Sequence, residues 1–336
     1  MRLSESLRKN IMEATINGVL NKFKGKSRRD ILFFEDILAD YVKECEDAGY
    51  KKEMKLISQK WASMVQQVIP KTLRKLSPLF LLNVIMKKAW TNIGILDDLH
   101  ITKENNIIKI TTKNEALTRI VGKNEFSVGS YTGILNALYN SQLECIDVIQ
   151  TKETSRYTFK FKNKSFKMKT KDKDLYNSLN YLIPNKGFTL KDALEKNIFQ
   201  LKENNRIYFR GKGIGPVENT IFHLISNQNM LLKKVPDISY KYFSEIIEKD
   251  SSNDRKLALL KVLLQVMGWG TIKIIIKSEN EVLFKIHNQP YGLQLEKDNW
   301  DFLIKTILGY LWILDKKFKI TDVKYSHRRL KILYSK

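Results

Sequence analysis

Short stretches of this chain recur in the same order about half a chain length apart, and this repetition constrains the fold more than any other feature. The recurring pairs are LLNV at 81–84 with LLKV at 259–262, Trp90 with Trp269, IIKI at 107–110 with LFKI at 283–286, and Asp147-Val148 with Asp322-Val323. Their offsets run from 175 to 179 residues, and small drifts of this kind are what loop insertions leave in a duplicated sequence. The sequence therefore predicts two tandem copies of one unit.

The two copies share one predicted order of elements: helices, a β-hairpin, a further helix and a final pair of strands. In the first copy the apolar period changes from helical to alternating. This change predicts a hairpin at 91–101 and 107–112, a helix at 127–140, and strands at 143–150 and 156–162. The second copy repeats the order as a helix at 257–270, a hairpin at 271–287, a helix at 299–315 and a strand pair within 318–334. The predicted fold is α+β, with the two copies packed as an intramolecular pseudo-dimer.

The boundary between the copies is predicted in IPNKGF, 183–188, because Pro, Asn and Gly interrupt two periodic regions there. This boundary gives one domain over 31–183 and a second over 184–336. Residues 1–30 are predicted to be a separate N-terminal helical segment.

Helices are expected throughout the first ninety residues. Ser4 and Ser6 can cap a helix over 7–23, and Ser27 or Asp30 can cap a second helix that ends at Gly49. A degenerate helix-turn-helix is one interpretation of this pair, although its spacing is looser than that motif requires.

Length, apolar content and cysteine usage indicate a globular protein without a structural metal. A chain of 336 residues with 43% hydrophobic residues is long enough for two cores. Its longest apolar runs, 76–86 and 307–314, are shorter than the ~18–20 residues of a membrane-spanning helix, and the start of the chain lacks a signal-peptide pattern. Cys45 and Cys145 lie far apart, and the four histidines do not cluster. We expect a cytoplasmic protein with no transmembrane segment, disulfide, metal or cofactor.

The net charge of +23 is the strongest indication of a partner. A surface this basic attracts polyanions such as nucleic acid or acidic membrane, at the expense of self-repulsion. A compositional origin is the alternative, because a Lys-, Ile- and Asn-rich chain is typical of AT-rich genomes. That origin accounts for Lys over Arg, but it leaves the shortage of acidic residues unexplained.

The predicted unit resembles the 4-vinyl reductase-type, or hydrocarbon-binding, domain, whose α+β fold is shared with subunits of transport protein particles. The best-matching stretch is FSVGSYTGILNALYNSQLECIDVIQTKETSRYTFKF, 126–161, and in the second copy GWG at 268–270 and NNRIYFRGKGIGP at 204–216 are similar to the family pattern. The resemblance spans 30–165 and 188–336. It implies a small hydrophobic ligand or an assembly role, and some family members are fused to a DNA-binding module. Metal-binding members carry a second Cys where this chain has Tyr157, so metal binding is not carried over.

Two groups of residues are candidates for a hydrophobic ligand site. Gly129 and Gly133 stand four apart on a predicted helix, which suits the wall of a ligand tunnel, a helix crossing between the copies, or ordinary tight packing on the sheet. Trp269, Trp300 and Tyr310 can line an apolar pocket, because aromatic rings provide large rigid walls. The alternative for these aromatics is plain core packing.

Candidate nucleic-acid contacts lie in a basic stretch, RYTFKFKNKSFKMKTKDK, 156–173. Strand alternation with a turn near Asn163 predicts a β-hairpin with one apolar face and one face carrying Lys160, Lys162, Lys167 and Lys169. Like charges opposed across a hairpin repel one another, so a bound polyanion would offset the repulsion, while a solvated sheet edge is the alternative. Arg328 and Arg329 in the basic C-terminal strand can extend this surface.

No catalytic pattern is present. The sequence contains no Gly-x-Ser-x-Gly and no HExxH, and the loop GKGIG at 211–215 is not a phosphate-binding loop motif. We expect a protein that is not an enzyme, acting as a regulator or scaffold that binds a hydrophobic ligand or a protein partner. The alternative function is nucleic-acid binding through the basic hairpin 156–173 and the basic C-terminal strand.

Overall fold

The chain forms two compact units of mixed α and β structure. The computed structural model describes residues 12–15, 18–21, 28–64, 69, 73–170, 187–289, 301–326 and 329–336. Unit 1 comprises 1–5, 38–177 and 201–207, and unit 2 comprises 6–37, 178–200 and 208–336. The chain thus passes between the units more than once, and the domain boundary expected at 183 lies outside the described residues.

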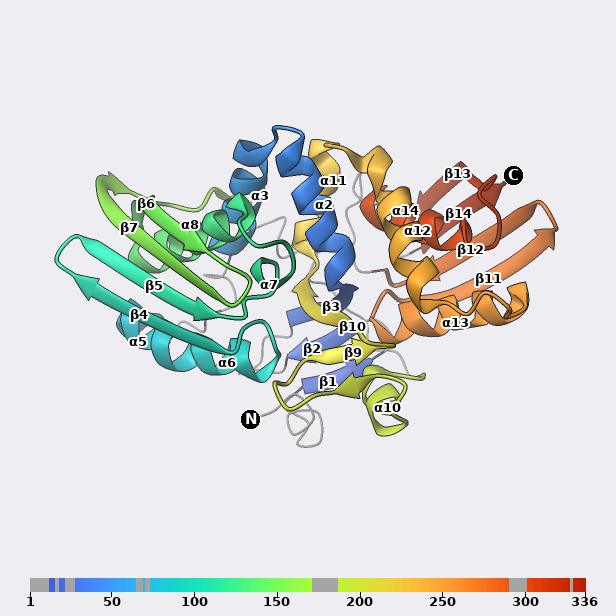
Figure 1. Cartoon of the computed structure of the whole chain (residues 1–336), viewed down its shortest axis with the longest axis horizontal. Coiled ribbons are helices and arrows are strands. Elements are labelled where there is room, and N and C mark those ends of the chain that lie inside the picture. Colours follow the sequence, from blue (N-terminus) through green and yellow to red (C-terminus); the bar gives the residue numbers. More distant parts are fainter. Residues whose placement is uncertain are drawn as a thin grey trace. The chain divides into compact units, whose positions relative to one another are not determined.

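Unit 1 is built on a four-stranded antiparallel sheet with strand order β4-β5-β7-β6 (Figure 1). Its strands are β4 (Asp98–Glu104), β5 (Ile107–Lys113), β6 (Ser141–Gln150) and β7 (Thr154–Ser165). Its helices are α3 (Lys51–Ser63), the 3-10 turn η2 (Leu73–Lys75), α5 (Pro78–Phe80), the π-helical segment η3 (Leu81–Met86), α6 (Lys87–Asn92), α7 (Thr118–Val121) and α8 (Glu125–Tyr139). Helix α2 (Glu35–Asp47) begins in unit 2 and continues into unit 1.

The core of unit 1 lies on one face of this sheet, which α8 and η3 cover. Strand residues such as Ile108 and Phe159 are fully buried there together with Leu82 of η3 and Leu135 of α8. Local sequence fixes the limits of α8. The Asn124 side chain accepts a hydrogen bond from the backbone N–H of Ser127 at 2.8 Å and so caps the first turn. Asn140 ends the helix in the left-handed conformation, φ 50°.

Unit 2 contains two sheets. Most of a six-stranded sheet belongs to it, in the order β1 (Met12–Thr15), β2 (Gly18–Asn21), β3 (Arg28–Phe34), β10 (Lys212–Glu218), β9 (Ile207–Phe209) and β8 (Gln200–Leu201). The second sheet has the order β11-β12-β14-β13, formed by β11 (Thr271–Ser278), β12 (Glu281–His287), β13 (Lys319–Ser326) and β14 (Arg329–Ser335). The helices are α10 (Leu190–Glu195), α11 (Thr220–Gln228), η4 (Leu232–Lys234), α12 (Val235–Ile246), α13 (Asn253–Val266) and α14 (Asp301–Leu311).

An aromatic cluster centred on Phe33 joins the sheets and helices of unit 2. The Phe33 ring stacks on Trp269 at a centroid distance of 5.8 Å, and it lies 4.6 Å from Phe222 and 5.6 Å from Phe302. The Trp269 indole N–H donates to the Leu32 carbonyl oxygen at 3.1 Å, so its one polar atom is satisfied inside the core.

The expected N-terminal helical segment is wrong where the structure describes it. Residues 12–15 and 18–21 form a hairpin in which Met12 pairs with Asn21, and β2 of this hairpin pairs with β3. Residues Ile31 to Phe34, expected at the start of a helix, are also strand. All four are buried, so both faces of this strand are covered. Partners far away in the sequence thus decided the structure of this segment.

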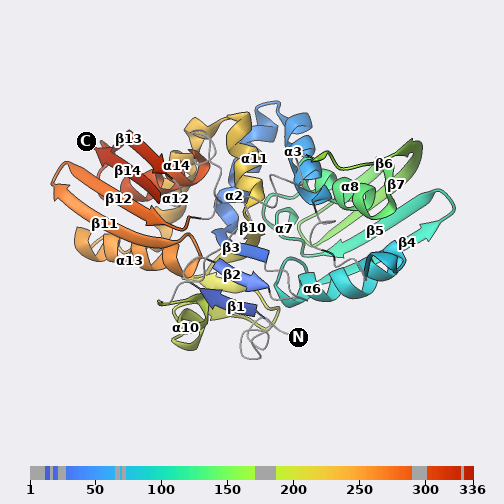
Figure 2. The same ribbon diagram turned by 180° about the vertical axis from the view of Figure 1, so that it is seen from behind.

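The element order predicted for each four-stranded sheet is confirmed. Each sheet is formed by a helix, a hairpin, a second helix and a second hairpin, and in each the fourth strand lies between the second and third (Figures 1 and 2). The first predicted hairpin begins later than expected, at Asp98. Residues before it form the end of α6 and a turn, with Gly94 at φ +74°.

Candidate nucleic-acid interface

The four lysines predicted to oppose one another in unit 1 do not do so. Strand β7 continues through Asn163 to Ser165, which pairs with Ser141, so the hairpin predicted over 156–173 is wrong. The reason is that β7 continues its backbone pairing with β6 past the position of the predicted turn. Lys160 and Lys162 lie on β7, whereas Lys167 and Lys169 follow the strand in irregular backbone.

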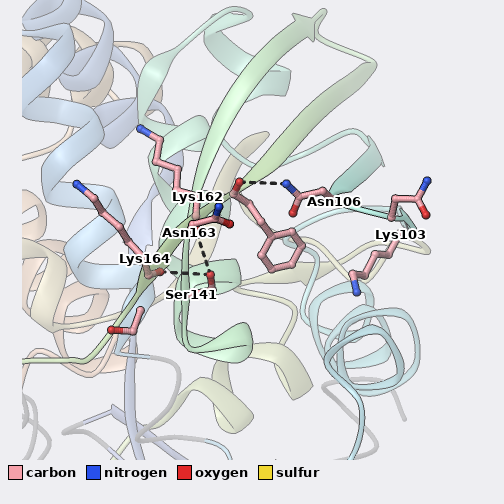
Figure 3. Close-up of a pocket in the computed structure, with 9 residues that line it drawn as sticks. Lys103, Asn106, Ser141, Lys162, Asn163 and Lys164 are labelled. Atoms are coloured by element: carbon pink, nitrogen blue, oxygen red, sulfur yellow. Dashed lines mark hydrogen bonds between the residues drawn. The ribbon is translucent and has the colours of Figure 1, made fainter.

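A shallow depression of about 400 Å³ lies beside the end of β7 (Figure 3). It is lined by Lys103, Asn105, Asn106, Ser141, Phe161, Lys162, Asn163, Lys164 and Ser165. Figure 3 shows Lys162 and Lys164 extending away from Lys103. The Lys103 ammonium lies 5.5 Å from the centre of the Phe161 ring, and Lys162 pairs with Glu144 at 2.9 Å.

The polar groups of this depression are already used to hold the strand ends together. The Asn106 side chain donates to the Phe161 carbonyl oxygen at 3.3 Å, and the Ser141 hydroxyl donates to the carbonyl oxygens of Lys162 and Lys164 at 3.4 and 3.3 Å. Because its lysines diverge (Figure 3) and the side chains of Asn106 and Ser141 are occupied, the depression is not a convergent anion site.

A row of four lysines crosses the four-stranded sheet of unit 2. Lys273 of β11 is directly opposite Lys285 of β12, Lys285 is opposite Lys331 of β14, and Lys331 is opposite Lys324 of β13. We call these four residues the lysine row. Directly paired residues point to the same face of a sheet, so the four side chains share one face.

The lysine row lies on the face of the sheet opposite the core. Phe284, Ile286, Ile332 and Tyr334, which alternate with Lys285 and Lys331 along their strands, are buried. The Tyr334 hydroxyl donates to the Ile304 carbonyl oxygen of α14 at 3.0 Å, which marks the covered face. Lys273, Lys324 and Lys331 are exposed, and Lys285 is half-buried between its two lysine neighbours.

Neighbouring positions on this outward face add charge and an apolar base. Arg329 lies in the adjacent register, opposite His287. On the other side of the row are the half-buried aliphatic residues Ile275, Leu283 and Leu333. Lysine stems commonly lie along apolar surface of this kind while the ammonium groups remain in water.

Few acidic side chains offset the charge of the row. Lys324 forms an ion pair with Asp322 at 3.2 Å. This pair contributes little to stability, because 74% of the Lys324 side chain is exposed. Among the described residues, Lys273, Lys285 and Lys331 have no acidic side chain within ion-pair distance. The pKa of His287 is lowered, first by burial and then by the charges of Arg329, Lys285 and Lys331. The smaller, electrostatic part of this lowering is consistent with the positive charge of the neighbouring row.

The corresponding face of the unit 1 sheet is balanced. Its outward rows are His100, Thr111, Arg156 and Ile149; Thr102, Lys109, Thr158 and Asp147; and Glu104, Ile107, Lys160 and Glu144. Each of these rows carries one Lys or Arg, and two of them also carry acids. Lys109 pairs with Glu104 at 3.4 Å and Lys162 with Glu144. The candidate nucleic-acid interface is therefore the lysine row, rather than the lysines proposed from the sequence.

The residues expected at a hydrophobic ligand site are engaged in packing. A Cβ on Gly129 or Gly133 would overlap backbone atoms of α3, so these glycines allow a helix crossing within unit 1 rather than between copies or onto the sheet. Tyr310 is fully buried, and its hydroxyl donates to the Lys256 carbonyl oxygen at 2.7 Å. Trp269 stands in the Phe33 cluster, while Trp300 lies outside the described residues.

Other functional classes find little support in the described part of the chain. Within it, no cluster of three His, Cys, Asp or Glu side chains is arranged to hold a metal ion. Burial raises the pKa of the Cys45 thiol to about 11, which keeps it protonated and unreactive. None of the helices described has the length and apolar content needed to cross a bilayer.

Of the basic residues named from the sequence, one lies next to this candidate interface. Arg329, predicted from the sequence as a basic contact, lies beside the lysine row. Arg328, predicted with it, lies outside the described residues. Lys273, Lys285, Lys324 and Lys331 were not proposed as a group, because they lie in four different strands. The signal that unites them is the pairing register of four strands.

Comparison with known proteins identifies no relative: the chain matches no protein-family model, and a search of curated proteins gives no significant match.

Proposed function

We propose that this chain is a non-catalytic nucleic-acid-binding protein and that the outward face of sheet β11-β12-β14-β13 is its contact surface. One observation carries the proposal: four lysines are opposed in register across every strand of that sheet. Like charges directly opposite one another destabilise a sheet, so the arrangement is costly unless a polyanion offsets it. Phosphate groups offer the required charge, and lysine ammonium groups are common phosphate ligands.

We further propose that the two four-stranded sheets descend from a tandem duplication of a vinyl-reductase-type unit. Support comes from their identical strand order and from the glycine-mediated helix crossings of the two units. In unit 1 Gly129 and Gly133 of α8 meet α3, and in unit 2 Gly309 of α14 meets Pro236 and Ser239 of α12. On this proposal the ancestral unit supplied a scaffold, and one copy acquired the lysine row.

A second candidate function is that of a scaffold that binds a protein partner at strand β6. This strand is an edge of its sheet, and Ile146 and Ile149 on it are 52% and 54% exposed. Exposed apolar side chains along an unpaired edge favour addition of a strand from another chain. The hydrophobic-ligand role has less support, since its candidate residues in the described chain are engaged in packing.

Fluorescence anisotropy with labelled DNA and RNA tests nucleic-acid binding. The test variant replaces all four lysines of the lysine row with Gln. The control variant replaces Lys160, Lys162, Lys167 and Lys169 with Gln and removes the same number of charges from unit 1. We expect binding to the wild type and to the control, and loss of most affinity in the lysine-row variant. Equal loss in both variants would refute a localised interface, and absence of binding by the wild type would refute the function.

A further inference from the structure

We infer that the lysine row recognises double-stranded nucleic acid through phosphates on the two sides of one groove, without contacting the bases. This inference rests on the proposed function and narrows it to a partner class and a mode of contact.

Single strands require a feature that this face lacks. Proteins that bind single-stranded nucleic acid combine basic grooves with aromatic side chains on which successive bases stack. The outward positions of the described sheet next to the row are Thr271, Ile275, Leu283, His287, Arg329, Leu333 and Asp322, none of which is Phe, Tyr or Trp. Among the sheet's aromatic residues, Phe284 and Tyr334 face the core and pack on each other at 5.4 Å. Tyr325 of the edge strand β13 is 38% exposed, but it is opposite the buried Leu330 and therefore belongs to the core-side positions rather than to the face of the lysine row. No stacking platform therefore accompanies the charges.

The width of the sheet prevents it from entering a groove to contact bases. The B-DNA major groove is about 12 Å wide and admits an α-helix or a two-stranded ribbon. Four strands spaced ~4.8 Å apart place the outermost backbones ~14 Å from each other before any side chain is added. The sheet must therefore lie across the groove, where it can touch only the backbone.

The same width suits contacts to both nucleic-acid strands. Because the row crosses the sheet from β11 to β13, Lys273 and Lys324 are its two ends. Their backbone separation of ~14 Å matches a groove of ~12 Å, so flexible lysine side chains at the ends can reach phosphates on opposite sides. Lys285 and Lys331 lie one strand in from the ends, so their long side chains can also reach phosphates on the nearer side of the groove.

Counterion release gives this arrangement a measurable signature. Four phosphate contacts predict a slope of log K against log salt of about −3.6 for duplex DNA. The affinity should then fall about 150-fold between ~50 and ~200 mM salt. Each lysine removed should make the slope shallower by about one.

The test compares partners of equal length by fluorescence anisotropy with the full chain. The probes are two duplexes of unrelated sequence, each of their separated strands, and vesicles containing an anionic phospholipid. We expect the duplexes to bind within about threefold of each other and at least tenfold more tightly than the single strands. The lysine-row Gln variant should lose the steep salt slope, which the Lys160/Lys162/Lys167/Lys169 control should retain.

Each alternative outcome identifies the step that fails. Preference for single strands, or strong preference for one duplex sequence, would overturn the groove-spanning inference and leave nucleic-acid binding intact. Binding to vesicles through the lysine row without binding to any nucleic acid would overturn both proposals. Calorimetric melting of each variant checks that it is folded. A variant with all four lysines of the lysine row replaced by Arg should bind like the wild type, because it keeps the charge.

Discussion

Replacing Lys285 with Gln should stabilise the protein while it weakens the proposed interface. Lys285 faces a lysine on both neighbouring strands, Lys273 on β11 and Lys331 on β14, and none of these three lysines has an acidic partner among the described residues. Each directly opposed pair of like charges costs about 0.2–1 kcal/mol, so removing two pairs should raise the free energy of unfolding by ~0.4–2 kcal/mol at low salt. For a unit of this size, 1 kcal/mol corresponds to roughly 2–4 °C in Tm.

Scanning calorimetry at two salt concentrations measures this gain. At ~10 mM salt the Debye length is ~30 Å and the lysines interact fully, whereas at ~1 M it is ~3 Å and the gain should largely vanish. Lys324→Gln is the matched control, because it removes one repulsion with Lys331 together with the ion pair to Asp322. Its melting temperature should stay close to that of the wild type. A Lys285→Gln protein no more stable than the wild type at low salt, or a gain that salt does not change, would refute the reasoning.

Three further predictions concern other parts of the fold. Gly133→Ala should destabilise unit 1 by ~1–3 kcal/mol in chemical denaturation because its methyl group would overlap the backbone of α3, whereas Ser130→Ala on the same helix should stay within ~0.5 kcal/mol. The folded-state pKa of His287 is below its unfolded value near 6.5, so protonation of His287 favours the unfolded state. Stability should therefore decline as the pH falls from about 6.5 through the folded-state pKa. His287→Gln should flatten that decline in melts recorded across pH, and an unchanged profile would argue against it. Glu46→Ala should cost about 1–3 kcal/mol because the Glu46 carboxylate accepts hydrogen bonds from the first N–H groups of α8, while Glu46→Gln, which keeps an acceptor, should cost less by the same denaturation assay.

The sequence predicted elements whose periodicity is local. The helix over 127–140 and the strands at 143–150 and 156–162 correspond to α8, β6 and β7, because alternation and helical spacing are visible within each segment. The strands at 12–15 and 18–21 could not be predicted in this way. They belong to a sheet whose next strands are β3 and β10, and β10 lies in the other half of the chain.

The interface was less predictable than the fold. A run such as 156–173 attracts notice because its lysines are close in sequence, yet the structure separates them into strand and irregular backbone. Lys273 and Lys324, by contrast, lie about fifty residues apart and meet only when β12 and β14 are placed between them. Charge density in a sheet depends on register, which a single sequence specifies poorly where strands pair across long loops.

The pairing of β3 with β10 also imposes an order on biosynthesis. Phe33 pairs with Gly215 and Ile31 with Val217, so β3 is made early and its partner late. About 180 residues lie between the two strands, which at ~5–20 residues per second amounts to roughly 10–40 s of translation. During that interval the apolar strand Ile31 to Phe34 has no partner on one edge, and such edges recruit other chains. The first strands of unit 2 therefore have to wait for the second half of the chain before they can pair fully, and we expect slow translation of the intervening region to increase aggregation.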